Sequence, residues 1–230
     1  MKKHLFHGLC MIAVLSVSKP IFAQSEDELG AWYIYNGFYN FSPKFELFFE
    51  SQLRTYEVAS QKETFFVRPY FNYNWNKSLQ TGLGLEYHSN STFDDGTDPV
   101  IDTEEFRTTL QVMLYQKVGR ASIQHRNRYE WRWLDGDALQ RMRYRLMVTI
   151  PITNKTMEKG TFFANTFNEF MVDTNPEVKL NQSRLYFAGG YQFSKNLSFQ
   201  FGYMNVYRTG SRHGRLQFFI IHKLWFYDRD

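Results

Sequence analysis

The sequence is poor in the features that most catalytic and secreted soluble domains use. It has one cysteine in 230 residues, Cys10, which lies in a segment that we expect to be removed. An exported chain without thiols cannot form disulfides, use a cysteine nucleophile or bind metal through cysteine. No phosphate-binding glycine loop or dinucleotide fingerprint is present. The mean hydropathy is −0.48, and after the N-terminal segment no apolar run resembles a membrane-spanning helix.

The N-terminus has the pattern of a secretory signal peptide over residues 1–23, leaving one domain over residues 24–230. Lys2 and Lys3 precede the short apolar stretch 9–17, and Ala23 ends the segment. Removal takes away three lysines and no acidic residue, so the net charge falls from +4 to +1. The basic pI is therefore no indication of a nucleic-acid partner, and we expect none. Export through the Sec pathway is predicted.

What is abundant is aromatic residues, 19% of the chain, arranged in strands. In 79–88, apolar residues alternate with polar or small ones over a full strand length, which is typical of a β-strand with two different faces. Such strands can close into a barrel with lipid outside and a polar lumen inside. Eleven segments have this character: 30–41, 45–56, 64–75, 79–89, 103–116, 121–134, 139–152, 161–172, 182–193, 197–208 and 214–227.

The pattern predicts an all-β, antiparallel, up-and-down transmembrane barrel in the bacterial outer membrane. Because bacterial single-chain barrels have even strand numbers, we expect twelve strands, or else ten. A twelfth would be a short strand near 24–30. Tight turns alternate with long polar connections at 90–102 and 173–181, typical of short periplasmic turns and longer outer loops. The acidic segment 90–102 does not match a calcium loop, although divalent cations could bridge it to lipopolysaccharide.

Charged residues gather on one face of the predicted strands. Since a charge that faces hydrocarbon costs a few kcal/mol, these rows should face the lumen. The predicted lumen residues are Glu46, Glu50, Arg54, Arg68, Glu86, Glu105, Arg107, Arg126, Arg128, Glu130, Arg132, Arg141, Arg143, Arg145, Glu169 and Arg184.

Two interpretations of that interior are open. In one, arginine and glutamate neutralise each other and fill a narrow, closed structural barrel. Arg128 would then have a carboxylate partner, and its loss would cost roughly 3–5 kcal/mol. In the other, the excess of arginine makes a small, porin-like pore that prefers anions. Arginine near an end of the barrel could also bind lipid phosphates.

The tryptophans Trp32, Trp75, Trp131, Trp133 and Trp225 are interpreted as aromatic girdles at the two membrane interfaces. The expected partners are outer-membrane lipids, lipopolysaccharide and the barrel assembly machinery, which commonly reads a terminal aromatic strand such as 224–227. The oligomeric state stays open.

No cofactor is expected, and the four histidines that remain after residue 23 show no metal-ligand spacing. The protein is not expected to be an enzyme. The alternative is an outer-membrane enzyme acting on envelope lipids, for which His88, a nearby Ser89 or Ser91, and Glu105 would have to meet across two strands. A second alternative is a soluble periplasmic lipocalin-like barrel, which would have to turn its large side chains inward.

Several segments resemble an outer-membrane β-barrel family, domain of unknown function 2490. They are Gly30-Ala31-Trp32, Glu50-Ser51-Gln52-Leu53-Arg54, Gln124-His125-Arg126-Asn127-Arg128-Tyr129-Glu130-Trp131-Arg132, Arg141-Met142-Arg143-Tyr144-Arg145 and Asn168-Glu169-Phe170. The resemblance spans nearly the whole chain after the signal peptide. It implies a barrel at the Gram-negative outer membrane and supplies no substrate. The repeated Arg-x-Arg rows look like the hallmark of the family.

Overall fold

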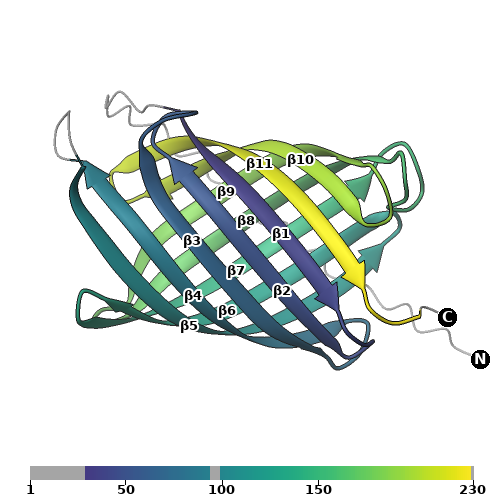
Figure 1. The fold of residues 1–230 in the computed structure, drawn as a ribbon, viewed down its shortest axis with the longest axis horizontal. Helices are drawn as coiled ribbons and strands as arrows, with labels where there is room; N and C mark the ends of the chain where they lie inside the picture. Colours follow the sequence, from purple (N-terminus) through teal and green to yellow (C-terminus); the bar gives the residue numbers. More distant parts are fainter. Residues whose placement is uncertain (1–28, 94–98, 229–230) are drawn as a thin grey trace, which may run out of the picture.

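The computed structural model describes residues 29–93 and 99–228, and these form one closed barrel of β-strands (Figure 1). The predicted signal peptide lies outside the described residues. No helix in the described part is long and apolar enough to cross a membrane. The strands are β1 (Gly30–Asn40), β2 (Phe45–Thr55), β3 (Lys62–Asn74), β4 (Leu79–Phe93), β5 (Pro99–Val118), β6 (Ala121–Leu134), β7 (Asp137–Pro151), β8 (Phe162–Asn175), β9 (Lys179–Gln192), β10 (Leu197–Arg208) and β11 (Ser211–Trp225).

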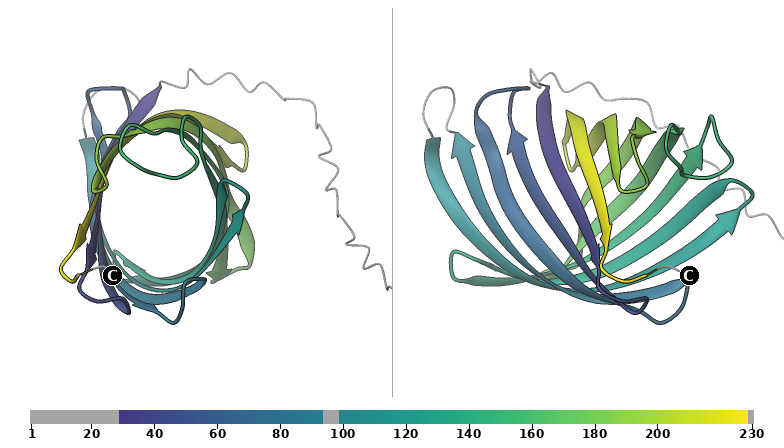
Figure 2. Two further views of the ribbon diagram at one scale, coloured as in Figure 1. Left: turned by 90° about the vertical axis from the view of Figure 1, so that its right-hand side faces the viewer. Right: turned by 45° about the vertical axis from the view of Figure 1, so that its right-hand side comes forward.

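The barrel closes through a parallel pair of its first and last strands. Each strand pairs antiparallel with the next, and β1 then pairs parallel with β11, from Gly30 opposite Arg215 to Asn40 opposite Trp225. Figure 2 shows the closed ring end-on and β1 beside β11. The expectation of twelve or ten strands is wrong for the described residues, which form eleven. An odd number of alternating strands leaves the first and last running the same way, so the closing pair must be parallel.

The connections do not separate a short-turn end from a long-loop end. At the end where β1 begins, the Gly30 end, the described connections are 56–61, 135–136, 176–178 and 209–210. At the opposite Trp225 end they are 41–44, 75–78, 119–120, 152–161 and 193–196. The expected long loops were wrong because strands extend into them: β4 runs to Phe93, β5 starts at Pro99, and β8 runs to Asn175. Asp94, Asp95 and Asp98 of the acidic segment lie outside the described residues.

The distribution of side chains is inverted relative to a soluble protein. Twenty-six buried residues of the described chain are polar or charged and thirteen are apolar, whereas large apolar side chains such as Phe71, Phe106 and Leu110 are exposed on the outer wall. β10 shows the alternation clearly, with Phe199, Phe201 and Tyr203 outward between buried neighbours. The strand period of two therefore sorts apolar residues to the outside and polar residues to the inside.

The interior carries an apolar cluster and rows of charged residues. The apolar cluster is contributed by β1, β8, β9 and β10, and Tyr186 and Met204 in it are fully buried. The charged rows run from β2 to β9, so β8 and β9 carry residues of both kinds. Side chains of both kinds fill the space that the ribbon leaves open in Figure 2.

Candidate functional site

The first group of ion pairs lies across β2, β3 and β4. Glu50 stands directly opposite Arg68 in the strand register, and Arg68 Nη2 lies 2.7 Å from Glu50 Oε2. The same guanidinium reaches Glu86 at 3.6 Å. Glu86 also accepts a hydrogen bond of 2.6 Å from the Tyr70 hydroxyl and lies 3.1 Å from His88 Nε2. Every one of these side chains is buried, and each is held by contacts within the group.

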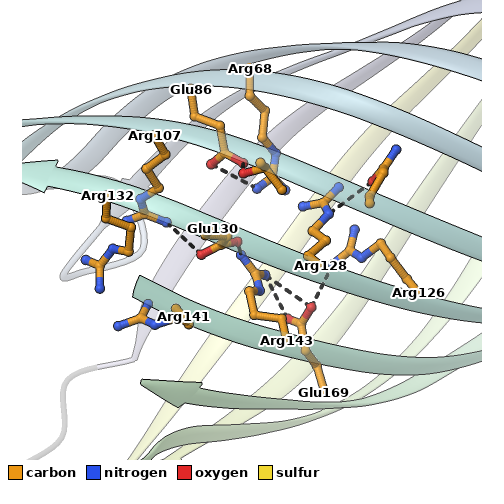
Figure 3. Close-up of polar contacts among 12 residues, drawn as sticks. Arg68, Glu86, Arg107, Arg126, Arg128, Glu130, Arg132, Arg141, Arg143 and Glu169 are labelled. Carbon is orange, nitrogen blue, oxygen red and sulfur yellow. Dashed lines mark hydrogen bonds and ion pairs between the residues drawn. The ribbon is translucent and has the colours of Figure 1, made fainter. Parts of the chain in front are cut away.

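A second, longer series of ion pairs begins on β5. Arg107 Nη2 lies 2.7 Å from Glu105, which also bonds Arg132 of β6. Arg107 Nη1 lies 3.8 Å from Glu130, and Arg143 of β7 donates to the same carboxylate at 2.7 Å. Figure 3 shows Arg107, Glu130, Arg132 and Arg143 of this series projecting from neighbouring strands toward one another. Each carboxylate is shared by two arginines.

The series ends on β8 and β9 at Glu169. This carboxylate accepts hydrogen bonds from Arg143 at 3.0 Å and from Arg126 at 2.6 Å (Figure 3). It also lies 3.5 Å from Arg184. Glu169 is 2% exposed. Five consecutive strands are thus cross-linked from the inside by one chain of ion pairs. We call Arg126, Arg128, Arg143, Arg145 and Arg184, which lie on β6, β7 and β9 around Glu169, the arginine cluster.

Three interior arginines have no carboxylate within ion-pair distance among the described residues. Arg54 donates to Gln52 and lies 3.8 Å above the Trp32 ring. Arg128 donates to Gln111 at 3.1 Å and lies over a tyrosine ring, and Arg145 donates to Gln124 at 2.9 Å. The expectation that Arg128 pairs with a carboxylate is wrong, because the residues opposite it are Gln111 and Arg143.

The structure brings all sixteen predicted lumen residues to the inner face, each buried or half-buried. Twelve form ion pairs, three are the arginines just described, and Glu46 accepts hydrogen bonds from Asn72 and Gln80. Sequence reasoning missed two acids near the Gly30 end. Asp173 lies 2.7 Å from Arg141, and Glu63 lies 3.7 Å from Arg215. Both stand at strand ends, where the alternation is weakest as a signal.

The girdle interpretation is wrong for Trp32. This side chain is 5% exposed and belongs to the interior apolar cluster, between Arg54 and Arg184. Its strand carries apolar residues on both faces, so alternation could not assign the face. Trp75 and Trp133 are exposed on the outside, and Trp131 and Trp225 are half-buried.

Two of the residues suggested for catalysis, His88 and Glu105, stand opposite each other on β4 and β5, but the serines bond to other residues. His88 is 3% exposed, contacts Glu86 and stacks on Phe66, whereas Ser89 accepts from Lys62 and the Ser91 hydroxyl donates to Asp102. In residues 29–93 and 99–228, no group of three or more His, Cys, Asp or Glu could hold a metal. The alternative of an enzyme stays an untested prediction.

Two depressions lie outside the charged interior. A groove of about 580 Å³ runs over β7–β11, floored by small residues such as Ala164 and Gly189 and walled by Phe187 and Phe201. A pocket of about 200 Å³ opens at the Gly30 end between Arg132, Asp173 and Lys179.

The sequence was compared with models of known protein families. Residues 29–217 match the family described as protein of unknown function (DUF2490), and the chain belongs to that family. Neither the curated proteins nor the solved structures contain a match.

Proposed function

We propose that this DUF2490 protein is a closed, non-conducting β-barrel of the bacterial outer membrane. The observation that carries the proposal is the inverted side-chain distribution. The described chain buries Glu86, Arg128 and Glu130 while it exposes Phe106 and Leu110. Such a distribution is stable in lipid hydrocarbon, because the lipid is as apolar as the side chains on the outer wall.

The outer wall supports a membrane location. Monomeric soluble proteins rarely expose contiguous apolar patches beyond a few hundred Å², yet apolar side chains project from the outer face of every strand. Each strand has 11 to 20 residues, which exceeds the roughly 9–11 that cross a bilayer when tilted. A soluble lipocalin-like barrel would need these large side chains inside. Outer-membrane lipids would then surround the outer wall, and the barrel assembly machinery would insert the protein into the membrane.

The interior supports a closed barrel over a pore. A water-filled channel leaves its wall accessible to water, but Thr109 and Glu130 are fully buried and Arg128 is 3% exposed. The ion pairs of Glu86, Glu130 and Glu169 join opposite charges across neighbouring strands, which is the packing of a filled small barrel. A structural role for the barrel follows from this packing.

Conductance tests the closed interior. The mature protein is reconstituted in a planar bilayer with a salt gradient, and insertion is verified by protease protection. We expect no discrete current steps from the inserted protein. Anion-selective steps would contradict the closed barrel and favour the pore, and Arg143→Glu with Arg145→Glu would then reverse the selectivity.

A pair of substitutions on β5 tests the membrane location. Leu110 is 48% exposed near the middle of the wall, and Val118 is exposed at the end of the strand. In phospholipid vesicles, Leu110→Arg should lower the free energy of unfolding by about 2–4 kcal/mol and Val118→Arg by about 0–1 kcal/mol, because the cost of a charge depends on depth. Equal and small effects at both positions would indicate a soluble barrel.

A further inference from the structure

The arginine cluster carries more positive charge than the acids around it can neutralise. Glu169 is the one carboxylate that Arg126 and Arg184 contact among the described residues. Arg143 shares Glu169 and also bonds Glu130, which Arg107 shares in turn. Arg128 and Arg145 add two further charges with amide partners only. Within ion-pair distance, the five guanidinium groups therefore share one whole carboxylate and part of another.

The strand register places arginines of β6 directly opposite arginines of β7. Arg126 stands opposite Arg145, and Arg128 stands opposite Arg143, in adjacent rows of β6 and β7. Directly opposed side chains in a sheet have Cβ atoms about 4.5–5.5 Å apart, and like charges in that position repel each other. Figure 3 shows Arg126, Arg128 and Arg143 projecting into the same region of the interior.

The same five side chains carry unused donors. The Nε atoms of Arg126, Arg143, Arg145 and Arg184 and the Nη1 atom of Arg128 are buried, with no hydrogen-bond partner in the described structure. Arg126, Arg128 and Arg143 are themselves more than nine-tenths buried. A buried donor without a partner is costly, and an uncompensated buried charge more so. An anion would accept from these donors and offset the excess charge at once.

We propose that the arginine cluster binds one small inorganic anion, of the chemistry of chloride, inside the barrel. The proposal depends on the burial and the excess charge of the arginine cluster and not on the membrane location or on conductance. The anion completes the series of ion pairs at its positive end, where no further carboxylate of the described chain reaches. It is a resident ligand that stabilises the fold.

The test is a chloride titration of thermal stability for the purified protein in non-ionic detergent, with sodium gluconate holding the ionic strength constant. Binding to the folded state alone should raise Tm saturably, on the order of 5–10 °C once chloride exceeds its dissociation constant a hundredfold. Bromide should substitute for chloride. A flat titration would mean that water alone occupies the site and would overturn the proposal.

Two variants separate the cluster from general charge effects. Arg128→Gln removes a guanidinium that has no acid partner, so it should abolish most of the chloride response while the protein still folds. Arg141→Gln is the matched control, because Arg141 is paired with Asp173 near the Gly30 end, and it should keep the full response. Retention of the response in Arg128→Gln would contradict the assignment.

A measurement on the unmodified protein covers the case in which Arg128→Gln does not fold. Exchange with a protein site should broaden the ³⁵Cl NMR line, and bromide should narrow it again by displacement. Broadening that bromide reverses supports the proposal. Broadening no greater than that of the denatured protein, together with a flat Tm titration, overturns it.

Discussion

Glu169 is contacted by three interior arginines, and Glu169→Gln tests how much its charge stabilises the barrel. The substitution keeps the size of the side chain and removes the charge that faces Arg126, Arg143 and Arg184 at 2.6, 3.0 and 3.5 Å. Removing one partner of a buried ion pair typically costs about 3–5 kcal/mol, because the remaining charge stays buried. Three guanidinium groups lose their shared partner here, so the upper part of that range is expected.

The measurement is the free energy of unfolding from a urea titration in phospholipid vesicles at one fixed salt concentration. Asp173→Asn is the control on the same strand. Asp173 bonds Arg141 and Asn181, but its side chain is 25% exposed. Partly hydrated pairs of this kind contribute about 0–1 kcal/mol. We expect the two variants to differ by at least about 2 kcal/mol.

A double variant identifies the cause. If the stranded charges destabilise Glu169→Gln, the further change Arg126→Gln should recover part of the loss. Equal stability of Glu169→Gln and Asp173→Asn, or strictly additive effects in the double variant, would refute the argument that buried charge compensation holds β6, β8 and β9 together.

Two further predictions concern packing and position. A Cβ at Gly84 would lie 2.4 Å from the fully buried ring of Tyr70, so Gly84→Ala should cost about 1–3 kcal/mol in urea unfolding. Gly189→Ala meets nothing within 4 Å on the outer wall and should be neutral or slightly stabilising, and equal losses in both would contradict the packing argument. In variants that keep a single tryptophan, brominated lipid should quench the fluorescence of Trp133 on the outer wall and not that of Trp32. Stronger quenching of Trp32 than of Trp133 would place Trp32 on the outside.

The barrel wall was within reach of sequence reasoning, and its closure was not. Alternation is local, so each of the eleven segments coincides with a strand, and the charged rows of β6 and β7 face inward together. Closure depends on β1 and β11, which are about 180 residues apart and pair parallel. No local sequence pattern predicts that pairing, and the rule of even strand numbers led to a wrong prediction of twelve or ten strands.

The sequence also did not predict which interior arginine pairs with which carboxylate. Arg126 and Arg128 look equivalent along β6, yet Arg126 reaches Glu169 from two strands away while Arg128 meets Gln111. Which arginine obtains a carboxylate depends on the stagger between strands that are not neighbours. Trp32 shows the same limit, since β1 offers apolar residues to both faces and the aromatic pattern alone suggested the outside.

The parallel β1–β11 pair places the start of the first strand and the end of the last strand at opposite ends of the barrel. Gly30 and Trp225 stand at opposite mouths, separated by the length of β1, which for 11 residues is roughly 35 Å. In a barrel with an even strand count, a short hairpin could join the two ends, because neighbouring antiparallel strands need only a few connecting residues. A circular permutant of this protein would instead need a linker that runs from one mouth to the other. Labels attached at Gly30 and at Trp225 would likewise lie at opposite mouths of the barrel.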